Sequence, residues 1–163
     1  AIGGSYGGVP SLTATSGPGL SLMIEALGLA VAAEIPVVVV DVMRVGPSTG
    51  IPTKSEQSDL NIAVHGLHGD APHLVFAANS VVDCLGTTQW AVQLAEALQA
   101  PAIVLSDQFL GQARAVVERP AEFPAGSARA IAEGGTPGYR RYAVTANGVS
   151  PMALPGTSQS TPE

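Results

Sequence analysis

The sequence predicts an α/β fold, a doubly wound and mostly parallel sheet with helices on both faces, and three observations support it. Short β-branched runs alternate with longer helical patterns along much of the chain. The segment 36–42 contains four consecutive valines with no polar alternation, which is typical of a central parallel strand covered on both faces. Loops rich in glycine and hydroxyl side chains follow the predicted strands, at the edge where such sheets bind ligands.

Strands and helices are expected to alternate in chain order. The predicted strands are residues 12–15, 36–42, 73–77 and 101–105. The predicted helices are residues 18–33, residues 56–64 and a segment that begins after Ser80. The first helix is apolar almost all round, which predicts burial on several sides. In the last helix Ser80 and Asp83 form a candidate capping box. The stripe that this helix is expected to bury is Val81, Leu85, Thr88, Val92 and Ala95.

The chain divides into a predicted domain, residues 1–115, and an extended Pro/Gly-rich tail or linker, residues 116–163. After Arg114 the hydrophobic periodicity fades and prolines recur. The segment 139–144 is the only anchor that we expect within this tail.

Composition and charge exclude several classes of protein. Seven basic and 13 acidic side chains give a net charge of −6, which disfavours nucleic acid or an anionic membrane as the partner. The single cysteine, Cys84, excludes an internal disulfide and any multi-cysteine metal or iron–sulfur site in this chain. The apolar stretch 20–33 contains Glu25 and is too short to cross a bilayer. Since no signal segment opens the sequence, we expect a cytoplasmic protein.

A glycine turn joins the first strand to the first helix and reads Thr13-Ala14-Thr15-Ser16-Gly17-Pro18-Gly19. Its glycines allow a ligand to approach the backbone, and the start of the helix offers free N–H donors with positive partial charge. Taken alone, the turn is more typical of an ordinary strand–helix connection.

Arg44 leaves the valine-rich strand and enters a loop rich in hydroxyl groups. A guanidinium binds a carboxylate through two charge-assisted hydrogen bonds, and hydroxyls donate to the remaining lone pairs. An ion pair of Arg44 with Glu56 or Asp59 explains the arginine equally well.

Other polar residues give weaker indications. His65, His68 and His73 lie within nine positions, but their spacing fits no helical metal pair. His68 alone suits a loop hydrogen bond or a proton transfer. Cys84 is expected to be a packing thiol, and Glu25 either a buried functional carboxylate or a contact to a neighbouring loop or subunit.

Together these motifs resemble the alpha subunit of 2-oxoacid:ferredoxin oxidoreductases, most closely the 2-oxoglutarate-type, or KorA-like, enzymes. The segments that carry the resemblance are residues 13–19, 22–23, 25–26, 36–41, 44–60, 68–72, 105–108, 141–151 and 154–156. Residues 44–60 are the most specific of them. The resemblance implies the thiamine diphosphate pyrimidine-domain fold, and oxidative decarboxylation of a 2-oxoacid, 2-oxoglutarate first, to an acyl-CoA with reduction of ferredoxin.

The resemblance also implies roles for individual residues. Arg44 and Thr53 would receive the carboxylate and side chain of the substrate, and Ser48 and Thr49 would shape the same loop. One wall of the thiamine diphosphate cleft would be formed by Thr15, Ser16, Gly17, Pro18 and Gly19.

The remaining parts of the enzyme are expected outside this chain. By resemblance, a beta subunit binds the diphosphate, its Mg²⁺ and an iron–sulfur cluster, while ferredoxin and coenzyme A engage the complex. The glutamate that activates the cofactor is expected upstream of Ala1, so the chain is expected to be a fragment without a catalytic residue or metal site, inactive alone. Since 12% charged residues is about half the usual share, we expect large interfaces, a homo- or hetero-oligomer, and self-association or poor solubility of the isolated chain.

Three alternatives remain open at this stage. The first is an enzyme of the same family that acts on pyruvate or a branched-chain 2-oxoacid. The second is another thiamine-dependent enzyme of the decarboxylase type, which can share the Thr-Ser-Gly-Pro-Gly turn. A third possibility is a module without catalytic activity that binds a beta-like partner.

Overall fold

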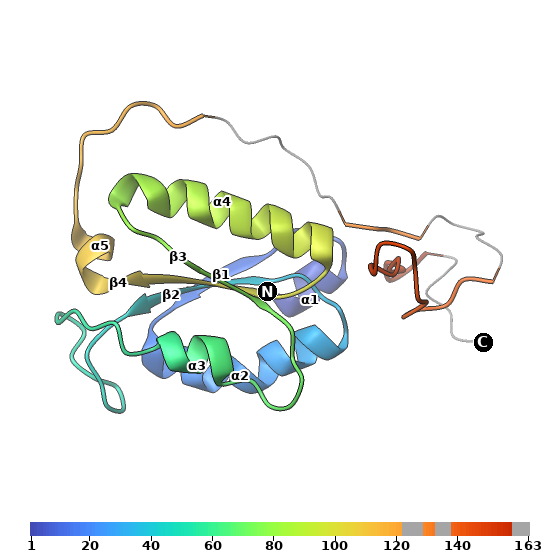
Figure 1. The fold of residues 1–163 in the computed structure, drawn as a ribbon, viewed down its shortest axis with the longest axis horizontal. Helices are drawn as coiled ribbons and strands as arrows, with labels where there is room; N and C mark the ends of the chain where they lie inside the picture. Colours follow the sequence, from blue (N-terminus) through green and yellow to red (C-terminus); the bar gives the residue numbers. More distant parts are fainter. Residues whose placement is uncertain (122–128, 133–137, 158–163) are drawn as a thin grey trace.

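The sheet has four parallel strands, as the valine-rich pattern predicts (Figure 1). The computed structural model describes residues 1–121, 129–132 and 138–157. The strands are β1 (Leu12–Thr15), β2 (Val38–Met43), β3 (Leu74–Ala77) and β4 (Ala102–Asp107), in the order β1-β2-β4-β3. Every pair is parallel, so the predicted fold class is confirmed.

Helices cover both faces of the sheet. On one face lie α2 (Gly17–Ala32) and α3 (Leu60–His65), and on the other lies α4 (Val81–Leu98) (Figure 1). The chain advances across the sheet from β1 through β2 to β3 and then returns to β4. Because crossovers between parallel strands are right-handed, the return places α4 on the opposite face from α2 and α3. Two short helices complete the fold, α1 (Ile2–Tyr6) and α5 (Gln108–Gln112).

The valine run of β2 contributes to two cores, one on each face. Val37 and Val39 belong to the cluster that α2 and α3 cover, whereas Val38 belongs to the cluster under α4. Buried valines on alternate faces match a central strand, as predicted. Ala91 and Ala95 of α4 are fully buried on the second cluster, since small side chains let a helix lie close to a sheet.

One predicted helix begins later than expected. The helix predicted at residues 56–64 begins only at Leu60, because Glu56 and Gln57 instead bond to distant groups, the N–H of Gly46 and the carboxylate of Asp107. The predicted Ser80 cap of α4 is present, since Ser80 Oγ accepts the N–H of Asp83. The reciprocal bond of a capping box differs, because the Asp83 carboxylate accepts the N–H of Asn79 instead of that of Ser80.

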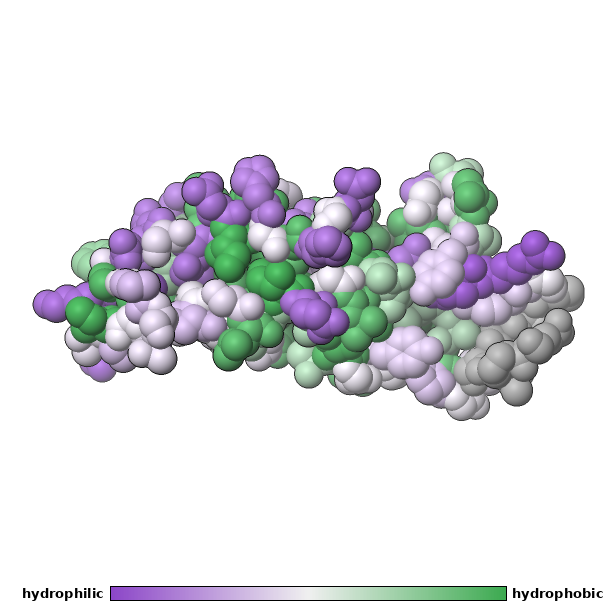
Figure 2. Space-filling view, turned by 90° about the horizontal axis from the view of Figure 1, so that it is seen from below, coloured by the Kyte–Doolittle hydropathy of each residue, from purple (hydrophilic) through white to green (hydrophobic). Residues whose placement is uncertain are grey.

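Predicted burial is wrong at three leucines. Leu85 of α4 is 46% exposed, because Ala91 and Ala95 set the contact face of the helix and turn Leu85 to its rim. Leu22 and Leu29 of α2 are 86% and 54% exposed, so α2 is not buried on several sides. Figure 2 views the molecule from the side on which α2 and α3 lie, and groups of apolar side chains are exposed there.

The described part of the tail folds back onto the domain. Arg129 forms an ion pair with Glu96 of α4, with Nη2 2.6 Å from Oε1. Within the predicted anchor, Arg141 pairs with Glu34, whereas the hydroxyl of Tyr139 accepts the N–H of Ala153 inside the same tail. Across the described residues no helix is long and apolar enough to span a membrane.

Candidate functional site

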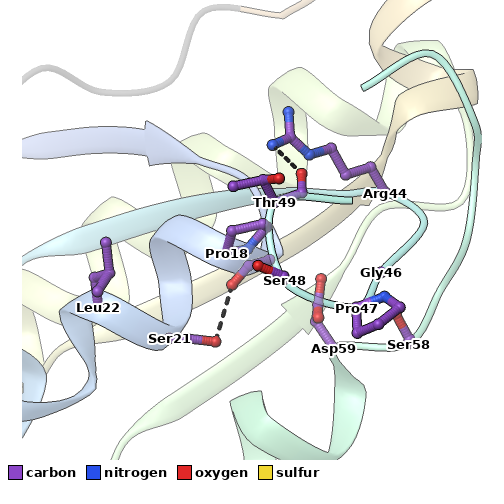
Figure 3. Close-up of a pocket in the computed structure, with 11 residues that line it drawn as sticks. Pro18, Ser21, Leu22, Arg44, Gly46, Pro47, Ser48, Thr49, Ser58 and Asp59 are labelled. Carbon is purple, nitrogen blue, oxygen red and sulfur yellow. Dashed lines mark hydrogen bonds between the residues drawn. The ribbon is translucent and has the colours of Figure 1, made fainter. Parts of the chain in front are cut away.

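A pocket of about 400 Å³ lies at the carboxyl ends of β1 and β2 (Figure 3). Its lining residues are Gly17, Pro18, Ser21, Leu22, Arg44, Gly46, Pro47, Ser48, Thr49, Ser58 and Asp59. The walls come from the start of α2 and from the loop between β2 and α3. This is the edge at which ligands bind open α/β sheets, and the structure places the glycine turn and the arginine loop together there.

Arg44 lines this pocket and carries one buried donor without a partner. Its Nη2 donates to the carbonyl oxygen of Thr49 at 2.6 Å, which holds the guanidinium under the loop. Its Nε is buried and has no hydrogen-bond partner. Within residues 1–121, which the structure describes throughout, neither Glu56 nor Asp59 forms an ion pair with Arg44, so that alternative is wrong. A buried donor without an acceptor is costly, and an anionic ligand would satisfy it.

The loop that closes over Arg44 has a fixed backbone. Val45 and Ile51 form an antiparallel bridge, and the N–H of Val45 donates to the carbonyl of Lys54 at 3.0 Å. Gly50 has φ +62°, and a Cβ there would lie 1.7 Å from the carbonyl oxygen of Val45, so only glycine fits. This backbone places Ser48 and Thr49 at the rim of the pocket.

The far end of the loop is tied to β4 and α5. Gln57 Nε2 donates to Asp107 Oδ2 at 2.8 Å, and Ser55 Oγ donates to Gln108 Oε1 at 2.9 Å. The N–H of Leu110, followed by the Gln57 amide, stabilises the Asp107 carboxylate and lowers its pKa. These contacts join residues that are far apart in the sequence, and they fix where the loop ends.

Packing explains two glycines of the turn. A Cβ at Gly17 would lie 2.5 Å from Asp59 Oδ2, and one at Gly19 would lie 1.8 Å from Thr15 Oγ1. Gly17 and Pro18 line the pocket, whereas Thr15, Ser16 and Gly19 support the turn from outside the lining. Thr53 is exposed and also lies outside the lining.

Asp41 and Asp59 form a carboxyl pair that sequence reasoning missed. Asp41 is 0% exposed on β2, and its burial, with Asp59 beside it, raises its pKa from 3.8 to about 7. Burial also raises the pKa of Asp59, which lines the pocket. The signal in the sequence is a single aspartate inside a valine run. A buried strand tolerates such a carboxyl group only where it has a partner or is neutral.

The other candidate residues lie apart from the pocket. Both ring nitrogens of His73 face backbone carbonyls, those of Ala71 at 2.7 Å and Ala63 at 2.6 Å. Glu25 is exposed rather than buried, and Cys84 is a free, half-buried thiol. The described residues contain no cluster of three or more His, Cys, Asp or Glu side chains that could hold a metal ion.

The known proteins similar to this chain are named as oxidoreductases of pyruvate or other 2-oxoacids. The family described as "Pyruvate flavodoxin/ferredoxin oxidoreductase, thiamine diP-bdg" matches residues 1–157. The 2-oxoglutarate oxidoreductase subunit KorA of Mycobacterium tuberculosis is 51% identical over 107 residues, 66% of this chain and 16% of that protein. The 2-oxoacid:ferredoxin oxidoreductase subunit alpha of Saccharolobus solfataricus is 36% identical, over 98% of this chain and 26% of that protein.

A solved structure agrees over nearly the whole chain. It is the 2-oxoglutarate:ferredoxin oxidoreductase from Magnetococcus marinus with 2-oxoglutarate, coenzyme A and succinyl-CoA bound, 48% identical with a TM-score of 0.87. The match covers 98% of this chain and 28% of that chain. The present chain therefore spans about a quarter of the length of such relatives.

Proposed function

This chain belongs to the pyruvate flavodoxin/ferredoxin oxidoreductase family, in its thiamine diphosphate-binding part, and from that premise we propose that it binds the 2-oxoacid substrate of an oxidative decarboxylation. The proposed substrate is 2-oxoglutarate, with coenzyme A as acyl acceptor and ferredoxin as electron acceptor. The relatives named for 2-oxoglutarate support this choice. Pyruvate and branched-chain 2-oxoacids are the alternatives, and turnover of each by the assembled enzyme distinguishes them.

The unsatisfied Nε of Arg44 is the observation that carries the proposal. A substrate carboxylate in the pocket would accept from this N–H, with Ser48 and Thr49 beside it. Because Nη2 is already committed to Thr49, the arginine holds the carboxylate with fewer bonds than a free guanidinium would. A weaker hold suits decarboxylation, since a tightly stabilised ground-state carboxylate is harder to lose. A role for Thr53 in binding the substrate side chain stays a prediction.

We propose that the opposite wall receives the pyrimidine part of thiamine diphosphate. Gly17 and Pro18 line this wall, together with the apolar Leu22. Thr15, Ser16 and Gly19 hold that wall in place. The cofactor supplies the electron sink for decarboxylation when it is bound. We further propose that a beta subunit completes the site with Mg²⁺ and an iron–sulfur cluster, and that the complex is cytoplasmic.

Arg44→Ala in the assembled enzyme tests the proposal. Loss of a charged hydrogen bond, about 1.5–3 kcal/mol, should raise the KM for the 2-oxoacid by roughly 10- to 150-fold. The KM for coenzyme A should change far less. The matched control is Lys54→Ala, which removes a positive charge from an exposed position of the same loop. Equal increases in both KM values would show that Arg44 is only structural.

A partner-binding module without catalytic activity is the second candidate. The exposed Leu22 and Leu29 of α2 favour it, because uncovered apolar side chains on one helix are typical of an interface. Calorimetry with thiamine diphosphate, in the presence and absence of a beta subunit, separates the two functions. Binding of the cofactor by the complex supports the enzyme, and its absence supports the module.

A further inference from the structure

We propose that Asp41 and Asp59 share one proton, and that Asp41 thereby acts as a positioning residue that holds Asp59 against the start of α2 in the pocket wall. The part that concerns substrate rests on the proposed function. The part that concerns the proton rests on the geometry of this chain alone.

Asp41 is enclosed by groups that cannot neutralise it. On β2 it lies in register with Thr15 of β1 and Leu105 of β4. Neither of its carboxyl oxygens has a hydrogen-bond donor within the described part of the chain. An isolated carboxylate in such a place is strongly disfavoured, whereas the neutral acid is not. The burial of Asp41 therefore favours a bound proton.

Asp59 supplies the acceptor for that proton. It precedes α3 but makes no side-chain cap for that helix, and its Oδ2 is also buried without a donor. The two side chains lie within hydrogen-bond reach of each other. Two ionised carboxylates at this distance repel, whereas one shared proton leaves a single negative charge and satisfies both groups. The pair titrates as a unit.

The charged groups around the pair do not prevent Asp41 and Asp59 from sharing a proton. Glu56, in the same loop, adds a further negative charge near Asp59 and raises its pKa. Arg44 lines the same pocket, but its Nη2 donates to the carbonyl oxygen of Thr49 (Figure 3). The start of α2 contributes Ser16 and Gly17, which do not titrate.

Asp59 connects the pair to the pocket wall. Its carboxylate packs so closely on Gly17 that a Cβ there would lie 2.5 Å from Oδ2. Gly17 and Asp59 line the pocket together with Arg44. Loss of the shared proton would place a second negative charge beside the site proposed for an anionic substrate, and would push Asp59 from Asp41 toward Gly17. The proton thus controls both the charge and the spacing of the wall.

An infrared measurement on the chain tests the shared proton. At about pH 6, where ordinary carboxyl groups are ionised, the wild-type chain should show a carboxylic-acid C=O band. Asp41→Asn, which has nearly the same shape, should remove that band, whereas the control Asp70→Asn, at an exposed position, should retain it. A missing band, or a band that survives in Asp41→Asn, would overturn the shared proton whatever the substrate is.

The pH profile of the assembled enzyme tests the positioning role. In the wild type the KM for 2-oxoglutarate should rise by roughly tenfold between about pH 6 and pH 8 as the pair loses its proton. In Asp41→Asn the amide donates to Asp59 without titrating, so that rise should disappear, whereas Asp70→Asn should keep it. A wild-type profile in Asp41→Asn would overturn the positioning role. The Arg44→Ala measurement reports separately on whether the pocket binds the 2-oxoacid.

Discussion

The two edges of the sheet treat their buried polar groups in opposite ways. At the edge where the strands begin, Arg129 donates to both carboxylate oxygens of Glu96 and to Ser5, and Gln99 donates to the carbonyl of Ser150 at 2.7 Å. At the edge where the strands end, buried polar atoms of the described residues lack partners. These atoms are Arg44 Nε, both carboxyl oxygens of Asp41, Asp59 Oδ2 and Gln108 Nε2, and one further such atom of the described residues, Gln89 Oε1, lies within α4.

This difference separates fold from function. A satisfied buried network stabilises one arrangement of the chain, and it needs nothing from outside. Unsatisfied buried groups cost stability. Arg44 and Asp59 in the pocket lining, with Asp41 beside Asp59, therefore indicate that a ligand, a proton or a partner completes these groups. Loss of a partner within the first network should therefore lower stability, and loss of an unsatisfied group at the second edge should change binding and pH dependence.

Arg129→Met should have the largest effect on stability. It removes Arg129 from the ion pair with Glu96, which is 3% exposed, and breaking a buried pair costs about 3–5 kcal/mol. Urea unfolding of the chain measures this loss. The double substitution Arg129→Met with Glu96→Leu should recover part of it, because no buried charge remains. A loss below about 1 kcal/mol would mean that the tail does not stabilise the domain.

Gly17→Ala should have the next largest effect. The added Cβ meets the Asp59 carboxyl, and overpacking of this kind costs about 1–3 kcal/mol. The matched control is Gly28→Ala in the same helix, where a Cβ meets nothing within 4 Å. That control should stabilise the chain by about 0.5–1 kcal/mol. Opposite signs for the two substitutions, measured by thermal unfolding, would confirm that Asp59 fixes the start of α2; equal signs would contradict it.

The Asp41 pair should give stability an unusual dependence on pH. Since the folded pKa of Asp41 is raised from 3.8 to about 7, the native state binds more protons than the unfolded state between these values. The free energy of unfolding should therefore fall as the pH rises from about 4 to 7, by up to about 1.4 kcal/mol per pH unit. Asp107, with its lowered pKa, acts below this window and in the opposite sense.

Asp41→Asn is the variant for that measurement. Urea unfolding at several pH values should show a flatter profile in Asp41→Asn than in the wild type or in Asp70→Asn. Parallel profiles in all three proteins would contradict a raised pKa at Asp41.

The same contrast explains which features the sequence reveals. The strands and the pocket edge follow from local patterns: the valine run predicts β2, and strand ends next to glycine or arginine loops predict the ligand edge. Arg44 was found because it leaves a buried strand. These features depend on neighbours in sequence, and the structure contains them close to the predicted boundaries.

The features that escaped prediction depend on distant neighbours. Arg129 lies in a segment without periodicity, and its partner Glu96 is 33 positions away. Asp41 differs from an ordinary polar residue only because Asp59 is brought beside it by the start of α3. Leu22 and Leu85 share the hydrophobicity of core residues, but small alanines and the sheet edge decide which face of a helix packs. Tertiary contacts set these outcomes.

Exposed leucines on α2 give the smallest expected effect on stability and the most direct test of the interface prediction. Leu22→Glu with Leu29→Glu replaces two exposed side chains, so the free energy of unfolding should change by only about 0.5 kcal/mol. Self-association of the chain should decrease, because two copies would contact each other through the exposed apolar side chains of α2. Sedimentation velocity over a concentration series measures this, with Leu85→Glu on the opposite face as the control. Association that persists in the α2 variant and disappears in Leu85→Glu would assign the interface to α4. A wild-type chain that is monomeric at high concentration would refute the prediction that the low share of charged residues reflects large interfaces.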